Sequence, residues 1–171
     1  MARRASISFK GLQLMERSDH DMKMSTLQKI ASALGLPCSG IESVLARYLL
    51  LDPESVEAIS WKILEDGPDS WRTHLMNFVD AFRRLQNSAL IESAPLDILD
   101  PGIRCLIAST VENLCSEVSR KIPSWCAGIE RLNEPWFVSG MENLKASALQ
   151  ESPPVFRKRN LFVLANFLDR A

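Results

Sequence analysis

Residues 102–121, GIRCLIASTVENLCSEVSRK, have a strong helical pattern. Their large apolar side chains recur at intervals of three and four, the spacing of one face of a helix. Asp100 and Pro101 precede them, a capping residue and a proline that suits the first helical turn. The stripe is broad enough for the interior of a helical bundle. Its members are Ile103, Leu106, Ile107, Val111, Leu114 and Val118.

Helical periodicity extends along most of the chain. Residues 70–86 carry an apolar stripe opposite a polar face, which predicts an amphipathic helix. Residues 53–66 follow Asp52, an expected cap, and stop at Gly67 and Pro68. Further helices are expected over residues 25–34, 39–51, 141–150 and 156–171.

Strands are not expected anywhere. The segment 137–139 is too short to pair convincingly, and prolines and a glycine between residues 122 and 135 predict turns with short helical pieces. The sequence therefore predicts an all-α fold.

Composition excludes several classes of protein. The chain has 171 residues, 46% of them hydrophobic, and a formal charge of −1, which fits one globular domain with a small appendage. No apolar run approaches the ~20 residues of a membrane span, and no secretory signal is evident. We therefore expect a cytoplasmic protein that does not contact membranes.

Cysteine and histidine usage points away from metal chemistry. The four cysteines include no Cys-x-x-Cys pair, and there are only two histidines. We expect reduced, mostly buried thiols, with no metal and no cofactor. No Gly-rich phosphate loop or metal-binding carboxylate pattern is present in the sequence either.

The charge is unevenly distributed. Residues 1–37 hold six Lys/Arg against three Asp/Glu, a net charge of +3, whereas the remainder holds 14 against 18, a net charge of −4. This asymmetry suggests that the two segments have different functions. We predict a boundary after residue 37, with a small basic segment (1–37) followed by an α-helical bundle (38–171).

The basic segment contains the most specific motif, ASISFKGLQLMERSDHDMKMSTLQKIASALGLP, residues 5–37. A small and an aliphatic residue, Ala5 and Ile7, precede a capping serine. Leu12 and Met15 are apolar residues three positions apart, and STLQKIASALGLP follows as a second helix with Ser25 as its expected cap. This arrangement resembles the second half of the Cro/lambda-repressor-like helix-turn-helix domain of the XRE family of bacterial regulators. Ser18 stands where that family usually has glycine.

The resemblance implies a recognition helix that enters the DNA major groove. Gln13 would offer its amide to adenine, Lys10 would reach guanine or phosphate, and Phe9 would contact a thymine methyl group. His20 and Lys23 would contact phosphate. The implied DNA-binding residues are Ser8, Phe9, Lys10, Gln13, His20 and Lys23.

The resemblance covers only half of the family domain. The first helix and most of the second should precede Ala5, and only Met1 to Arg4 stand there. Three explanations are open: a truncated amino end, a half-domain retained as a structural relic, or completion by a partner chain.

Residues 38–171 match no catalytic motif. The basic cluster Arg157, Lys158 and Arg159 is a candidate contact for phosphate or for a partner protein, and a solvated helix start is the plainer reading. Arg159-Asn160 also resembles half of the Arg-polar motif of HEPN-type ribonucleases, but the histidine that should follow is absent.

These features favour a non-enzymatic transcription regulator that binds double-stranded DNA as a homodimer. By analogy of size and plan, we expect it to be the antitoxin of a toxin–antitoxin pair, with the toxin as partner protein. The alternatives are a protein-interaction module with an inert helix-turn-helix remnant and, less favoured, a helical nuclease-like enzyme.

Overall fold

The computed structural model describes residues 13, 23, 25, 26, 28, 29 and 51–169. Internal contacts divide the chain into two units, Met1–Leu50 and Leu51–Ala171, and each is described by itself. The predicted boundary after residue 37 lies outside the described residues, as does the expected helix over 39–51 apart from Leu51.

The second unit confirms the predicted all-α fold. Its described residues form five α-helices, four short 3₁₀ turns and only two strands of two residues each. The α-helices are α4 (Val56–Asp66), α5 (Trp71–Leu85), α6 (Pro101–Glu117), α7 (Lys145–Glu151) and α8 (Pro154–Arg157). The 3₁₀ turns are η1 (Pro68–Ser70), η2 (Ser88–Ile91), η3 (Ser124–Gly128) and η4 (Glu142–Leu144).

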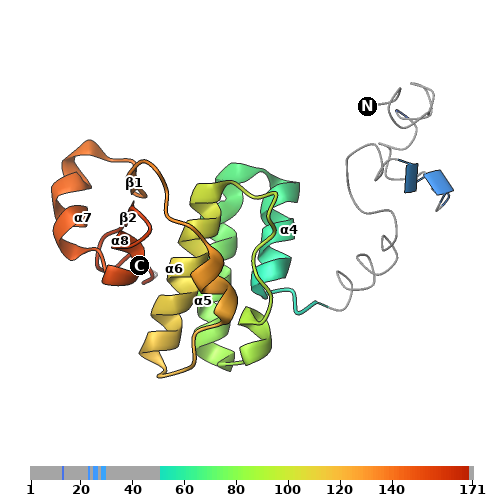
Figure 1. Ribbon diagram of the computed structural model, residues 1–171, viewed down its shortest axis with the longest axis horizontal. Helices are drawn as coiled ribbons and strands as arrows, with labels where there is room; N and C mark the ends of the chain where they lie inside the picture. Colours follow the sequence, from blue (N-terminus) through green and yellow to red (C-terminus); the bar gives the residue numbers. More distant parts are fainter. Residues whose placement is uncertain (1–12, 14–22, 24, 27, 30–50, 170–171) are drawn as a thin grey trace. The chain divides into compact units, whose positions relative to one another are not determined.

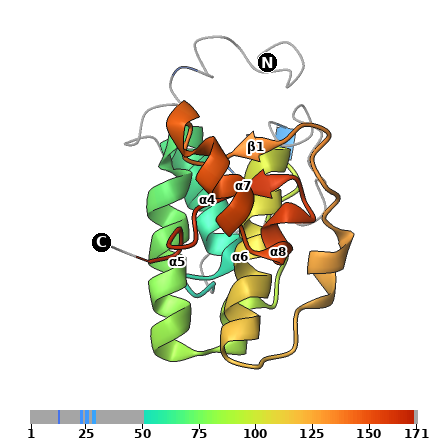
Figure 2. The same cartoon turned by 90° about the vertical axis from the view of Figure 1, so that its left-hand side faces the viewer.

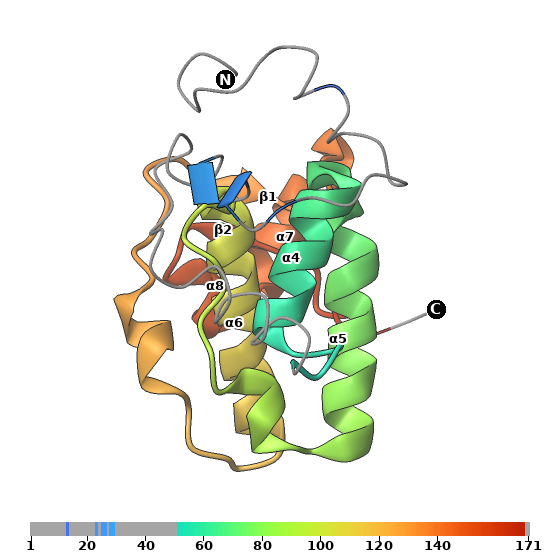
Figure 3. The same ribbon diagram turned by 90° about the vertical axis from the view of Figure 1, so that its right-hand side faces the viewer.

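Helices α5 and α6 form the middle of this unit. Helix α4 packs against α5, while α8 packs against α6 on the opposite side (Figure 1). The views from either side agree, because the carboxy-terminal elements lie in front of α5 and α6 in Figure 2 and behind them in Figure 3. The core therefore has three layers, with α6 covered from two sides.

Helix α6 is accordingly buried around most of its circumference. The predicted stripe is in the core except for Val118, which follows the helix and is half-buried. Polar residues on other faces of the helix are also buried, including Ser109, Thr110 and Glu112. Asp100 caps this helix as predicted, because its Oδ1 accepts hydrogen bonds from the amides of Gly102 (2.8 Å) and Ile103 (3.3 Å). The apolar stripe of α5 is likewise buried at Leu75, Phe78, Val79 and Phe82.

The start of α4 differs from the prediction. Asp52 is not the cap, because its Oδ1 accepts from the amide of Glu54 (3.0 Å) within a turn that precedes the helix. The cap is Ser55, whose buried hydroxyl accepts from the amide of Ala58 at 3.2 Å. The helix thus begins one turn later than Pro53, and it ends before Gly67 as expected.

The carboxy-terminal tail also differs, since the predicted helix over 156–171 is wrong. Helix α8 stops at Arg157, and Asn160 adopts a left-handed backbone with φ of 58°. Strand β2 (Leu161–Phe162) then pairs in parallel with β1 (Trp136–Phe137), so the expectation of no strand pair is also wrong. Phe137 and Phe162 are opposite each other in this pair, and their rings stack with centroids 5.0 Å apart.

Candidate functional site

Two of the six implied DNA-binding residues can be placed. Gln13 lies in a helix with its side chain exposed, and Lys23 is exposed just before the next helix. The carbonyl of Lys23 accepts a hydrogen bond from the amide of Thr26 at 2.9 Å, and exposed Gln28 and Lys29 continue that helix. Ser25 is itself helical, so the prediction that it caps this helix is wrong. The other four residues, Ser8, Phe9, Lys10 and His20, lie outside the described residues.

The basic cluster of residues 157–159 does not form a single surface. Arg157 is exposed, whereas Arg159 is only 3% exposed and points into the unit. Its guanidinium donates to Glu112 Oε1 at 2.7 Å and to the carbonyl of Cys126 at 2.6 Å. Lys158 is half exposed and its ammonium contacts the other oxygen of Glu112. Arg159 is therefore occupied by an internal ion pair and is not available to a phosphate.

Opposing effects act on the pKa of Glu112. Burial alone would raise this pKa, because the charged form loses hydration. Hydrogen bonds from Arg159 and Lys158, together with their positive charges, outweigh burial and hold the pKa below its ordinary value. The carboxylate is therefore ionised at neutral pH, which suits an ion-pair partner better than a general acid.

A helical nuclease-like enzyme would need Arg159, Asn160, His74 and a carboxylate in one cleft, but these residues have separate partners. His74 Nε2 lies 2.8 Å from Asp66 Oδ2 at the junction of α4 and α5. Asn160 donates from its side-chain amide to the carbonyl of Leu132 at 2.6 Å. Arg159 pairs with Glu112, as above. The contacts of these residues hold structural elements together and do not join them in one cleft.

The three described cysteines are buried and free, as expected; Cys38 lies outside the described residues. Burial raises the pKa of each thiol, and that of Cys126 reaches about 12. The thiol of Cys105 donates to the carbonyl of Glu130 at 3.0 Å. Thiols with raised pKa values are poor nucleophiles at neutral pH, so these cysteines serve packing.

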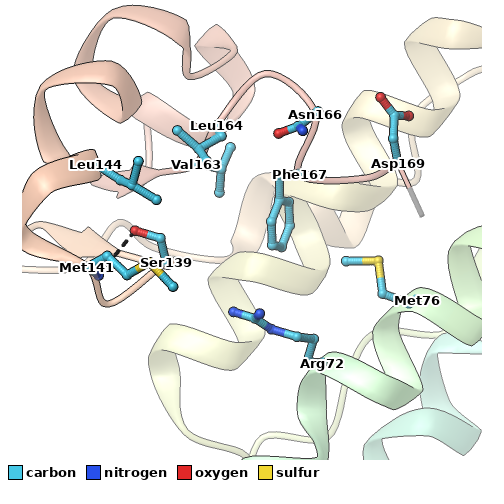
Figure 4. A pocket seen from close by; sticks show the side chains of 10 residues that line it. All are labelled: Arg72, Met76, Ser139, Met141, Leu144, Val163, Leu164, Asn166, Phe167 and Asp169. Carbon is cyan, nitrogen blue, oxygen red and sulfur yellow. Dashed lines mark hydrogen bonds between the residues drawn. The ribbon is translucent and has the colours of Figure 1, made fainter. Parts of the chain in front are cut away.

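The second unit has an apolar pocket of about 380 Å³ between α5, the region after β1, and the tail (Figure 4). Phe167 stands in the middle of the view, Met76 and Arg72 approach it from α5, and Ser139 approaches it from the other side. We call this hollow the tail pocket. It is lined by Arg72, Met76, Ser139, Met141, Leu144, Val163, Leu164, Asn166, Phe167 and Asp169.

The wall that the tail contributes is held firmly. Arg83 of α5 donates to the carbonyl of Leu168 at 2.8 Å and also pairs with Glu117 of α6 at 3.1 Å. Phe167 packs edge-on against Phe156, with ring centroids 6.1 Å apart. The pocket is therefore built into the fold, as ligand pockets usually are.

Two further pockets, a polar one of about 420 Å³ and a more apolar one of about 530 Å³, lie beside the start of α6. The smaller one is lined by Arg104, whose guanidinium pairs with Asp97 at 2.6 Å, together with Glu130 and Arg131. Its lining includes both positive and negative side chains, so it favours neither an anionic nor a cationic ligand.

A comparison of this chain with protein-family models, curated proteins and solved structures finds no match. Within residues 51–169 and the few described ones before them, no cluster of His, Cys, Asp and Glu could hold a metal ion. The described helices also include none with the length and apolar character to cross a membrane.

Sequence reasoning missed the tail pocket and the Glu112–Arg159 pair. The pocket brings together segments about 90 residues apart in the chain, so no local pattern marks it. The ion pair left a weak signal, because Glu112 directly follows Val111 in a helix whose apolar stripe is unusually broad. A carboxylate beside such a stripe needs a cationic partner when the helix is covered on two sides.

Proposed function

We propose that this chain is a DNA-binding transcription regulator in which the basic segment 1–37 contacts DNA and the helical unit serves interaction. The observation that carries the proposal is Gln13, a helical residue with an exposed side chain at the position where the helix-turn-helix resemblance expects a base contact. A glutamine amide can donate to and accept from adenine at once, which discriminates among base pairs in the major groove.

Exposed polar residues before and within the following helix support the same role. Lys23, Gln28 and Lys29 are exposed, and a lysine just before a helix can neutralise a backbone phosphate. Proteins that read DNA this way usually act as dimers on two half-sites, so a homodimer belongs to the proposal. We further propose that the protein acts in the cytoplasm and has no enzymatic activity.

A protein-interaction module, with the antitoxin of a toxin–antitoxin pair as its specific form, is the second candidate. The observation that favours it is the group of exposed large apolar side chains in the helical unit. Met141 is 58% exposed and Leu149 is 48% exposed, and both follow β1. Such side chains can anchor a partner protein, although singly exposed ones are also common on monomers.

Titration of the full chain with fluorescent DNA from upstream of its own coding sequence tests the first candidate. We expect binding that weakens steeply with salt, because each neutralised phosphate releases counterions. The double variant Lys10→Ala/Gln13→Ala should lose most of this binding. The matched control is Arg84→Ala/Gln150→Ala, which removes one cation and one amide from exposed positions of the second unit and should bind as the parent does.

Two results would separate the candidates. Equal binding by both double variants would show that residues 10 and 13 do not read DNA. Co-purification with a neighbouring gene product, without any retention of DNA, would favour the interaction module.

A further inference from the structure

We propose that the tail pocket binds a small apolar carboxylic acid, with the hydrocarbon part inside and the carboxylate at Arg72. This inference goes beyond DNA binding and does not depend on it, since every residue that lines the pocket belongs to the second unit.

The interior of the pocket is suited to a flexible hydrocarbon. Leu144, Val163 and Leu164 present aliphatic surface, and Phe167 presents a ring (Figure 4). Two further lining residues are methionines, whose unbranched and polarisable side chains adapt to ligands of irregular shape. Binding in such an interior is favourable because it removes apolar ligand surface from water.

Arg72 supplies the charge that selects an acid. Its guanidinium lies 5.3 Å from the ring centroid of Trp71, a cation–π contact. Within the part of the chain that the structure describes, no carboxylate forms an ion pair with it. Figure 4 shows its side chain extending from α5 toward the pocket, below Phe167. A guanidinium can bind a carboxylate through two parallel hydrogen bonds.

Asp169, the acidic residue among the described residues that line the pocket, forms no ion pair with Arg72. Asp169 lines the far edge in Figure 4, and its carboxylate lies 3.6 Å from Arg83. Asp169 therefore shares Arg83 with Glu117 and does not pair with Arg72, which has no carboxylate partner among the described residues.

The size of the pocket favours a small molecule over a protein. A hollow of about 380 Å³ falls in the range of ordinary small-molecule sites, about 300 to 1,000 Å³. A stable protein interface instead needs about 800 Å² on each partner. We therefore assign the pocket to a free acid such as a medium-chain fatty acid.

Decanoate and decanol are the probes, because they share a hydrocarbon chain and differ in charge. Calorimetric titration of the full-length protein, below the concentration at which decanoate forms micelles, should show decanoate binding about ten-fold more tightly than decanol. Arg72→Met should remove that ten-fold preference. Arg84→Met is the matched control on the same helix and should preserve it, because Arg84 does not line the pocket.

A second variant locates the site. Leu144→Trp should fill the pocket and weaken decanoate by ten-fold or more while circular dichroism stays unchanged. Absence of decanoate binding to the parent protein, equal affinity for decanoate and decanol, or full binding by Leu144→Trp would each overturn the proposal. These outcomes leave the DNA titrations unaffected, so the two proposals fail separately.

Discussion

Glu112 and Arg159 form a buried ion pair in the helical unit. Both side chains are almost fully buried, at 3% and 4% exposure, and they connect α6 to the end of α8. Arg159 also donates to the carbonyl of Cys126 and thereby fixes η3. A buried ion pair adds little stability compared with apolar packing, but the loss of one partner leaves an uncompensated charge.

Glu112→Gln should therefore destabilise the protein by about 3–5 kcal/mol, because Arg159 remains charged without an anionic partner. Urea denaturation measures the free energy of unfolding. The control on the same helix is Glu117→Gln, which weakens an exposed pair with Arg83 and should cost about 1 kcal/mol or less. Adding Arg159→Met to Glu112→Gln should restore part of the loss. A double variant no more stable than Glu112→Gln would contradict this account.

The Glu112–Arg159 pair should make the free energy of unfolding depend on pH. The pKa of folded Glu112 lies below its ordinary value of 4.5, so its ionised form stabilises the fold at neutral pH. This stabilisation should decline as the pH falls from about 4.5 through the lower folded pKa. The difference in unfolding free energy between the parent and Glu112→Gln should shrink over that window. A difference that stays constant down to pH 2 would show that Glu112 does not titrate as described.

At the scale of elements, the start of α4 distinguishes the sequence prediction from the structure. Ser55→Ala should cost about 1 kcal/mol of unfolding free energy, because the amide of Ala58 loses its acceptor in a buried place. Asp52→Ala should cost less, since Asp52 bonds only to Glu54 in the preceding turn. Thermal or urea denaturation of both variants makes the comparison. A larger loss for Asp52→Ala would reinstate Asp52 as the cap.

Local sequence patterns were sufficient to predict where the long helices lie. The Asp100-Pro101 start and the three-and-four spacing of α6 are short-range features, and the structure confirms both. At residues 52–55 two capping residues stood three positions apart, and the pattern alone did not show which one the helix would use. In the folded protein Ser55 is the cap, because its buried hydroxyl accepts the hydrogen bond from the amide of Ala58.

The spacing of apolar residues in the tail did not predict its structure. Leu161, Leu164 and Leu168 fit a helix, but β2 pairs with a segment 25 positions earlier in the chain. Alternating burial of Leu161 and Val163 around a half-buried Phe162 is the strand signal that was present. Asn160 was a second signal, because asparagine tolerates the left-handed backbone that ends a helix.

At the scale of the whole molecule, the candidate sites belong to separate units. Gln13 and Lys23 fall in Met1–Leu50, whereas the tail pocket falls in Leu51–Ala171. Gln13 was predicted from a motif within one short segment, which a sequence displays directly. The tail pocket arises only when α5 and the tail meet, so it could be found only in the fold. The proposed regulator thus combines a contact to DNA in one unit with a ligand pocket in the other.

The proposed function requires Gln13 to discriminate among base pairs, which a comparison of two duplexes measures. Fluorescence anisotropy at fixed salt gives the ratio of the affinities for the upstream DNA site and for a scrambled duplex. We predict that Gln13→Ala lowers this ratio by about 5- to 150-fold, the value of one bidentate base contact. Lys23→Ala is the control and should weaken both duplexes alike, because a phosphate contact carries no sequence information. An unchanged ratio for Gln13→Ala, or a parent protein that binds both duplexes equally, would contradict the proposed function.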